Sequence, residues 1–137
     1  MNRDETRGYV ELEVYRRGVA QVKPLHELVA RFPDFEKFEL ANQMRRACKS
    51  VPTNIAEGYA KRRSPKDFSN FLTIAMGSAN EMEVHFEIAR VLEYVTEEER
   101  DAFVEEYRII GKQLNRLIQY WRSDKAPATS NQRQGDQ

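Results

Sequence analysis

The chain has few of the residues on which most enzyme sites depend. It contains one cysteine, Cys48, and two histidines, His26 and His85. A single cysteine excludes an intrachain disulfide and fits a reducing compartment, so we expect a cytoplasmic protein. The Glu-x-x-His, His-Glu-x-x-His and Cys-x-x-Cys spacings of metal sites are absent from the sequence. We therefore expect no metal and no cofactor, and we expect His85 to pair at the surface with Glu81, one helical turn before it.

Other absences narrow the function further. No serine, threonine or cysteine has the neighbouring base of a nucleophile, and Cys48 falls on an apolar stripe, which is more often core than catalyst. No glycine-rich loop follows a strand pattern, so phosphate binding through such a loop has no support. No window approaches the roughly 20 apolar residues that cross a bilayer, and the N-terminus lacks the pattern of a secretory signal. We expect a soluble protein that is not an enzyme, with no membrane partner and no small-molecule substrate.

The apolar residues that are present recur at helical spacing in four segments of this 137-residue chain, and strand alternation is nearly absent. Short connectors at 32–34, 57–64 and 94–96 make antiparallel neighbours of successive segments. The sequence therefore predicts an all-α fold, an up-and-down antiparallel four-helix bundle with kinked helices, over residues 10–124. A flexible N-terminus, residues 1–9, precedes it. Residues 125–137 lack aromatic and branched aliphatic side chains and are predicted to form a disordered tail.

The helix starts are clearest in the second half of the chain. Thr96 and Glu99 have the spacing of a capping box, and Ser64 precedes a proline that suits the first helical position. The third and fourth segments then keep one apolar face each: Phe68, Phe71, Leu72, Ala75, Ala79, Met82, Phe86 and Ala89, and Phe103, Val104, Tyr107, Ile110, Leu114, Leu117, Ile118 and Trp121.

Prolines interrupt the first half. In the second segment the apolar stripe is Ala41, Met44, Cys48, Val51 and Ile55. Pro52 lies inside that pattern, so the helix either ends near Ser50 and restarts or continues through a kink that frees a backbone carbonyl. If the helix continues, we expect the Asn54 side chain to hydrogen-bond the exposed backbone. Pro24 predicts a second kink in the first segment, whose apolar positions are Val14 or Tyr15, Val19, Val22, Leu25 or His26, and Val29.

Charge is unevenly distributed, although the formal net charge is zero. Residues 45–66 carry seven basic side chains and one acid, whereas residues 81–106 carry ten acids and two arginines. Such runs are most often solvated helix faces that neutralise one another. The alternative is a phosphate-binding patch, provided that the fold brings the basic residues together, with Tyr59 as a stacking surface. The residues of this predicted patch are Arg45, Arg46, Lys49, Lys61, Arg62, Arg63 and Lys66.

A specific motif lies within the same region. The stretch Ser50-Val-Pro-Thr-Asn-Ile-Ala-Glu-Gly58 is preceded by Arg45-Arg46-Ala47 and followed by Phe71-Leu72, Ala75, Gly77-Ser78 and Glu81. In this order and spacing the residues resemble the four-helix-bundle proteins encoded in intervening sequences of bacterial 23S ribosomal RNA genes. The resemblance runs from about Leu12 to Trp121. The motif positions it marks are Asn54, Glu57, Gly58, Gly77, Ser78 and Glu81.

The resemblance implies an up-down bundle that assembles as a ring, commonly a homopentamer, without known catalytic activity. A related accessory protein of diversity-generating retroelements binds nucleic acid and a reverse transcriptase. By this likeness we expect a non-enzymatic oligomeric accessory factor that binds RNA, DNA or a nucleoprotein through the basic patch.

Two alternatives remain. One is a self-assembling structural scaffold that does not bind nucleic acid, in which the motif residues serve helix packing. For Gly77 and Ser78, close approach of a neighbouring helix is then the expected role. The other is an enzyme with an intersubunit site, which requires Asn54, Glu57 and Glu81 to meet around a pocket.

Overall fold

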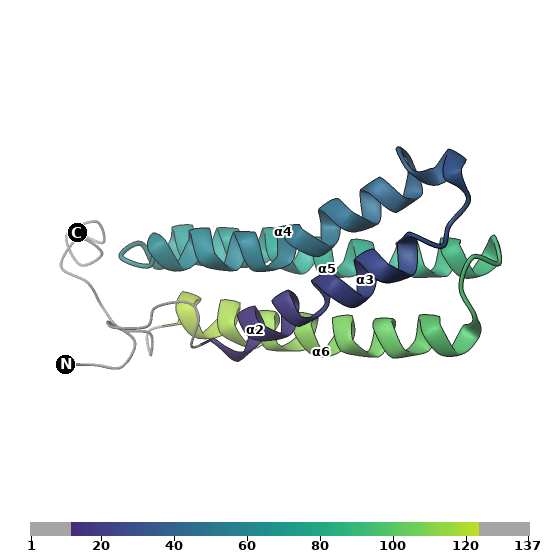
Figure 1. The fold of residues 1–137 in the computed structure, drawn as a ribbon. Helices are drawn as coiled ribbons and strands as arrows, with labels where there is room; N and C mark the ends of the chain where they lie inside the picture. Colours follow the sequence, from purple (N-terminus) through teal and green to yellow (C-terminus); the bar gives the residue numbers. More distant parts are fainter. Residues whose placement is uncertain (1–11, 124–137) are drawn as a thin grey trace.

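The computed structural model describes residues 12–123 and is all-helical over that range. The predicted flexible N-terminus and disordered tail lie outside the described residues. The described elements are α2 (Glu13–Ala20), α3 (Val22–Val29), the short 3-10 helix η2 (Asp34–Glu36), α4 (Leu40–Ala60), α5 (Pro65–Val91) and α6 (Glu97–Arg122). Helices α4, α5 and α6 lie alongside one another, and α2 and α3 follow each other along α6 and α4 (Figure 1). The all-helical prediction is confirmed, and this arrangement is consistent with the predicted bundle.

Helix α4 continues through Pro52, which settles the choice left open by the sequence. The N-terminal half of α4 turns away from α5, and its C-terminal half runs beside α5 (Figure 1). Proline has no amide hydrogen, so the carbonyl of Cys48, four residues earlier, loses its helical partner. Contrary to our expectation, Asn54 does not bond that carbonyl; its Nδ2 donates to the Ser50 carbonyl and to the Ser50 hydroxyl, both at 2.9 Å.

The first predicted helix is two helices of eight residues each, because the chain breaks at Gln21. Pro24 is the third residue of α3, where a helix leaves its amides without partners and a missing N–H costs nothing. The break changes which side chains face the core. Val19, predicted to be buried, is 44% exposed, whereas Gly18 is buried against the α4 bend. A Cβ on Gly18 would lie 3.2 Å from Val51 Cγ1 and 3.3 Å from Pro52 Cδ.

The remaining helix ends follow local sequence. Ser64 accepts a hydrogen bond from the Asp67 amide, and Thr96 and Glu99 form the predicted capping box. Helix α4 ends at Ala60, although the connector was predicted to begin at Glu57, so the connector to α5 is shorter than predicted. Glu93, in the corner after α5, has a φ of 63°, which lets the Tyr94 amide donate to the Ala89 carbonyl at 2.8 Å.

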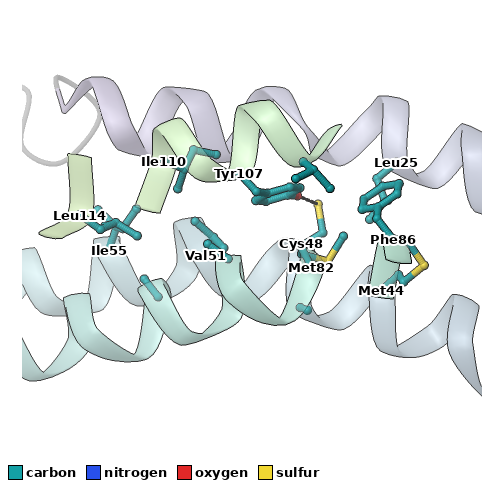
Figure 2. Close-up of a cluster of buried hydrophobic side chains, with 14 of the residues drawn as sticks. Leu25, Met44, Cys48, Val51, Ile55, Met82, Phe86, Tyr107, Ile110 and Leu114 are labelled. Atoms are coloured by element: carbon teal, nitrogen blue, oxygen red, sulfur yellow. Dashed lines mark hydrogen bonds between the residues drawn. The ribbon is translucent and has the colours of Figure 1, made fainter. Parts of the chain in front are cut away.

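A continuous apolar core runs between the helices (Figure 2). The predicted stripes of α4, α5 and α6 supply it, and Met44, Val51, Leu72 and Tyr107 are fully buried. Within the core, the Tyr107 hydroxyl donates to the Cys48 sulfur at 3.3 Å. Burial raises the pKa of the Cys48 thiol, so Cys48 is a neutral core residue.

One face of α5 remains outside this core. Its side chains Ile74, Val84, Ile88 and Val91 are 52%, 58%, 41% and 71% exposed. None of the described helices has the length and apolarity to cross a membrane. Over the same residues, no three histidine, cysteine, aspartate or glutamate side chains gather as a metal-ligand set.

Candidate nucleic-acid interface

The structure divides the predicted basic patch into two groups. Arg45, Arg46 and Lys49 lie in the N-terminal half of α4. The other four lie in the corner between α4 and α5 and in the first turn of α5: Lys61, Arg62, Arg63 and Lys66. The helix continues between them, and a rise of 1.5 Å per residue places Lys49 and Lys61 about 18 Å apart along the axis. The condition for a single patch is therefore not met within one chain, because Pro52 bends α4 without folding it back.

Aromatic rings support the corner group. The Arg62 guanidinium lies 4.1 Å from the centroid of the Tyr59 ring and donates to the Tyr59 carbonyl at 3.0 Å. Lys61 Nζ lies 4.8 Å from the centroid of the Phe71 ring. Both contacts are cation–π interactions, which hold the cations near the surface without neutralising their charge.

Tyr59 itself is not the stacking surface that we expected. It is only 7% exposed, and it packs edge-on against Phe68 with ring centroids 5.9 Å apart. The Arg62 guanidinium occupies a position over its ring. The Tyr59 ring therefore packs beneath the Arg62 guanidinium and is not exposed to a ligand.

The fold adds a cation that the linear sequence did not reveal. Helix α6 ends beside the start of α5, where Arg122 Nε donates to the Ser69 hydroxyl at 3.2 Å. The predicted up-and-down topology could have placed Arg122 here, since an antiparallel α6 must end where α5 begins. We call the resulting set the basic end: Lys61, Arg62, Arg63, Lys66 and Arg122.

A groove opens at the basic end between α5 and α6, with a volume of about 350 Å³. Lys66 and Arg122 contribute charge to it, and Trp121 contributes an indole ring. The other lining residues are Pro65, Ser69 and Asn70.

The other basic group has a more mixed setting. Arg45 Nη2 donates to the Lys37 carbonyl at 2.8 Å, which ties α4 to the preceding connector. Arg46 lines a groove of about 370 Å³ between α4 and α5, together with Gln43, Ala47, Ser50, Ser78 and Glu81. Because Glu81 lines the same groove, its carboxylate weakens the attraction of Arg46 for an anion.

The motif residues mainly join α4 to α5. The hydroxyls of Ser50 and Ser78 are 2.7 Å apart, and Asn54 bonds Ser50. A Cβ on Gly58 would lie 2.7 Å from Phe71 Cβ, so only glycine permits this close packing.

Gly77 has a different environment from Gly58. A Cβ added at Gly77 would meet nothing within 4 Å inside the chain. The expected close approach of a neighbouring helix is therefore wrong for Gly77 within one chain.

The enzyme alternative places Asn54, Glu57 and Glu81 around a pocket between subunits, and within one chain these three residues do not line the same groove. Glu81 lines the α4–α5 groove, whereas Asn54 and Glu57 are not among the residues around it. Glu81 instead bonds His85, with Oε2 2.8 Å from Nε2. The pairing is as expected, but His85 is buried rather than at the surface.

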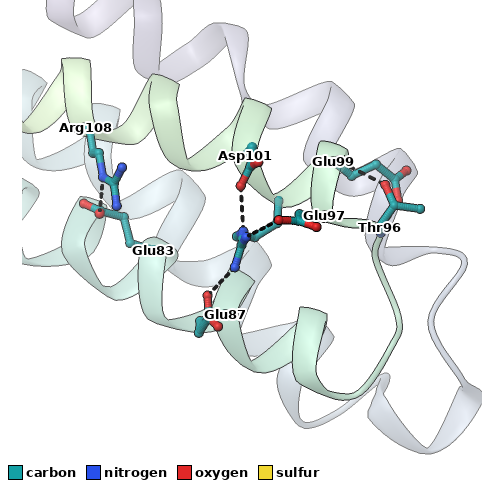
Figure 3. Close-up of polar contacts among 8 residues, drawn as sticks. Glu83, Glu87, Thr96, Glu97, Glu99, Asp101 and Arg108 are labelled. Atoms are coloured by element: carbon teal, nitrogen blue, oxygen red, sulfur yellow. Dashed lines mark hydrogen bonds and ion pairs between the residues drawn. The ribbon is translucent and has the colours of Figure 1, made fainter.

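The acidic stretch is largely paired within the chain. Arg100 contacts Glu87 at 2.7 Å, Asp101 at 2.8 Å and Glu97 at 3.6 Å, and Arg108 contacts Glu83 at 3.2 Å (Figure 3). Further pairs join Arg31 to Glu99 and Arg17 to Glu106, both at 2.8 Å. The expected neutralisation of the acidic residues therefore occurs, but through arginines outside the basic stretch.

The structure defines a helical protein with a cluster of basic side chains at one end, where α5 begins and α6 ends, and with many of its acidic side chains paired elsewhere. A family model described as "23S rRNA-intervening sequence protein" matches residues 10–116, so the chain belongs to this family. The family predicted from the motif is thus confirmed.

A solved structure from Bacteroides thetaiotaomicron VPI-5482 is similar to the chain. It is described as a protein with unknown function from the S23 ribosomal protein family. The sequences are 27% identical, the TM-score is 0.67, and the match covers 77% of this chain and 95% of that one. No curated protein matches the chain.

Proposed function

We propose that the chain is a non-enzymatic, oligomeric four-helix-bundle protein of the cytoplasm that binds RNA or DNA, alone or in a nucleoprotein, through the basic end. The observation that carries the proposal is the concentration of charge. Residues 57–67 carry four of these cations, Lys61, Arg62, Arg63 and Lys66, against two acids, Glu57 and Asp67, in a chain with no net charge. This local excess of two positive charges, beside which α6 places Arg122, attracts phosphates without a whole-molecule field.

The contacts at the basic end favour phosphate binding. The Tyr59 and Phe71 rings hold Arg62 and Lys61, so these side chains lose less freedom when an anion binds. Lys61, Arg62, Lys66 and Arg122 take part in none of the ion pairs between described residues. Binding a phosphate therefore need not break an existing bridge. Arg45, Arg46 and Lys49 supply a second, weaker contact region.

The proposed oligomer uses the exposed face of α5. Ile74, Gly77, Glu81, Val84, Ile88 and Val91 follow one another in alternating steps of three and four, the spacing of a helix seam. The exposed side chains of Ile74, Val84, Ile88 and Val91 leave an apolar surface, interrupted by Glu81, that a second copy of the chain would cover. The open space at Gly77 would admit a partner helix. The family resemblance suggests a ring of five copies.

The same α5 face favours the second candidate, a self-assembling scaffold. In that case the motif residues serve packing, and the basic end has no nucleic-acid partner. The two candidates differ in whether binding to nucleic acid depends on the basic end.

A matched pair of variants tests the proposal. Binding of the full chain to structured RNA and to duplex DNA is measured across a salt series for the wild type, for Lys61→Gln/Lys66→Gln and for Lys23→Gln/Lys112→Gln. All four lysines are exposed, and each variant removes two positive charges. The first variant should flatten the log-log salt slope by about 0.7–0.9 for each phosphate that the protein no longer neutralises, whereas the second should not. Circular dichroism confirms that both variants remain helical.

The outcomes separate the two candidates. A slope that both variants reduce equally would show attraction without a defined site and would refute the basic end as the interface. Negligible binding by all three proteins would leave the scaffold.

A further inference from the structure

The groove at the basic end combines an indole ring, two cations and an amide in one place. Its lining includes Trp121 and Arg122 from α6, and Lys66 and Asn70 from α5. Its volume of about 350 Å³ lies within the range of small-ligand sites. We propose that this groove binds an unpaired nucleotide, whose base stacks on Trp121 and whose phosphates contact Lys66 and Arg122. The inference rests on the proposed function and specifies the form of nucleic acid.

The indole ring is held in position before any ligand arrives. Its centroid lies 4.9 Å from that of Phe68 and 6.0 Å from that of Tyr120, with interplanar angles of 64° and 88°. Trp121 is only partly buried, so some of the ring borders the groove. A ring fixed by its neighbours loses little freedom when a base stacks on it.

The groove floor also holds the Arg122 guanidinium in place. The buried Ser69 hydroxyl donates to the Lys66 carbonyl at 3.0 Å and accepts from Arg122 Nε at 3.2 Å. One hydroxyl thus joins the first turn of α5 to the last turn of α6. Its bond to Nε leaves the terminal nitrogens of the Arg122 guanidinium able to donate to a phosphate.

This chemistry selects unpaired nucleotides over duplex. Proteins that bind single strands combine cations along the backbone with aromatic rings that stack on bases. Inside a duplex both faces of each base are already stacked, so the indole can reach only the two end pairs. Exposed Asn70 adds donor and acceptor groups for a base edge.

The test uses a property of the sequence, since Trp121 is the only tryptophan in the chain. Full-length protein is titrated with oligo(dT), with oligo(U) and with a DNA duplex, each of about ten nucleotides per strand. Tryptophan fluorescence reports stacking, and anisotropy of a labelled strand reports binding separately. We expect single strands to quench the fluorescence and the duplex to leave it nearly unchanged. The two single strands show whether RNA or DNA is preferred.

Two kinds of variant check the assignment. Trp121→Leu should weaken single-strand binding about tenfold and leave duplex binding unchanged, while Trp121→Tyr should retain most of the affinity. Because Trp121 also contacts the core, a second comparison uses exposed positions of α5. Asn70→Asp places a carboxylate in the groove and should weaken single-strand binding, whereas Asn80→Asp adds the same charge elsewhere on the helix and should weaken it less.

The results separate this inference from the proposed function. Anisotropy that shows salt-dependent binding without quenching, together with unchanged affinity in Trp121→Leu, would overturn the stacking site and leave the basic end as the interface. Equal quenching by duplex, or by inorganic phosphate alone, would also overturn it. Absence of binding to every nucleic acid would refute the proposed function itself.

Discussion

Replacing Gly58 with alanine tests the account of how α4 packs on α5. The new methyl carbon would lie 2.7 Å from Phe71 Cβ and 2.9 Å from Phe68 Cδ1. Phe71 Cβ is fixed to the helix backbone and cannot rotate away, so the two helices must separate. Overpacking of this kind costs about 1–3 kcal/mol, and we expect the upper half of that range here. Alanine's better helix propensity returns about 1 kcal/mol, so the variant should be about 1–2 kcal/mol less stable.

Gly77→Ala is the matched control because it makes the same chemical change in the next helix. Nothing lies within 4 Å of the added methyl group, so helix propensity alone should stabilise a single chain by about 1 kcal/mol. Urea unfolding followed by circular dichroism measures both variants. With a slope of about 2 kcal/mol/M, the midpoint should fall by roughly 0.5–1 M for Gly58→Ala and rise for Gly77→Ala.

The result that refutes this reasoning is a Gly58→Ala protein at least as stable as the wild type. Because stability of an oligomer depends on concentration, the series is run at several protein concentrations. A Gly77→Ala protein that loses stability only at high concentration would place a partner helix on Gly77, in agreement with the proposed oligomer.

Two further predictions concern pH and assembly. The Thr96 amide, and then Arg31, hold the pKa of Glu99 below its usual value of 4.5. The ionised Glu99 carboxylate therefore stabilises the fold fully above pH 4.5, and this stabilisation is lost as the pH falls through the folded-state pKa. Glu99→Gln should therefore lose less stability than the wild type when the pH is lowered below 4.5, and Glu98→Gln is the control. Equal acid sensitivity of Glu99→Gln and the wild type would contradict the role given to Glu99. Val84→Glu puts a charge in the exposed α5 seam, so it should lower the mass measured by light scattering without reducing helix content. Asn115→Glu, on the exposed surface of α6, should leave the mass unchanged. An unchanged mass for Val84→Glu would exclude this seam as the interface.

Much of the fold is readable from the sequence because its signals are local. The capping box at Thr96 and the spacing of side chains such as Leu72, Tyr107 and Leu114 depend only on helix geometry. The first segment was less predictable. The chain breaks at Gln21, so α2 and α3 do not share one continuous apolar stripe, and within α2 it is Gly18 that packs against the α4 bend while Val19 lies outside.

The candidate site was only partly predictable. Charge counting found Lys61 to Lys66, but it also joined them to Arg45, because distance along the sequence does not show the separation that a continuous helix produces. It missed Arg122 and Trp121, which come from the far end of the chain. It also assigned Tyr59 to stacking, although packing against Phe68 buries that ring.

The sequence by itself determined that the chain forms helices, where most of them begin, which faces are apolar and to which family the chain belongs. These properties follow from spacing within a few turns and from the order of the motif residues. Only the tertiary structure decided that α4 continues past Pro52, that Gly58 packs against α5 and that Arg122 lies beside Ser69. Each of these depends on contacts between segments, because helix packing sets which side chains share a surface.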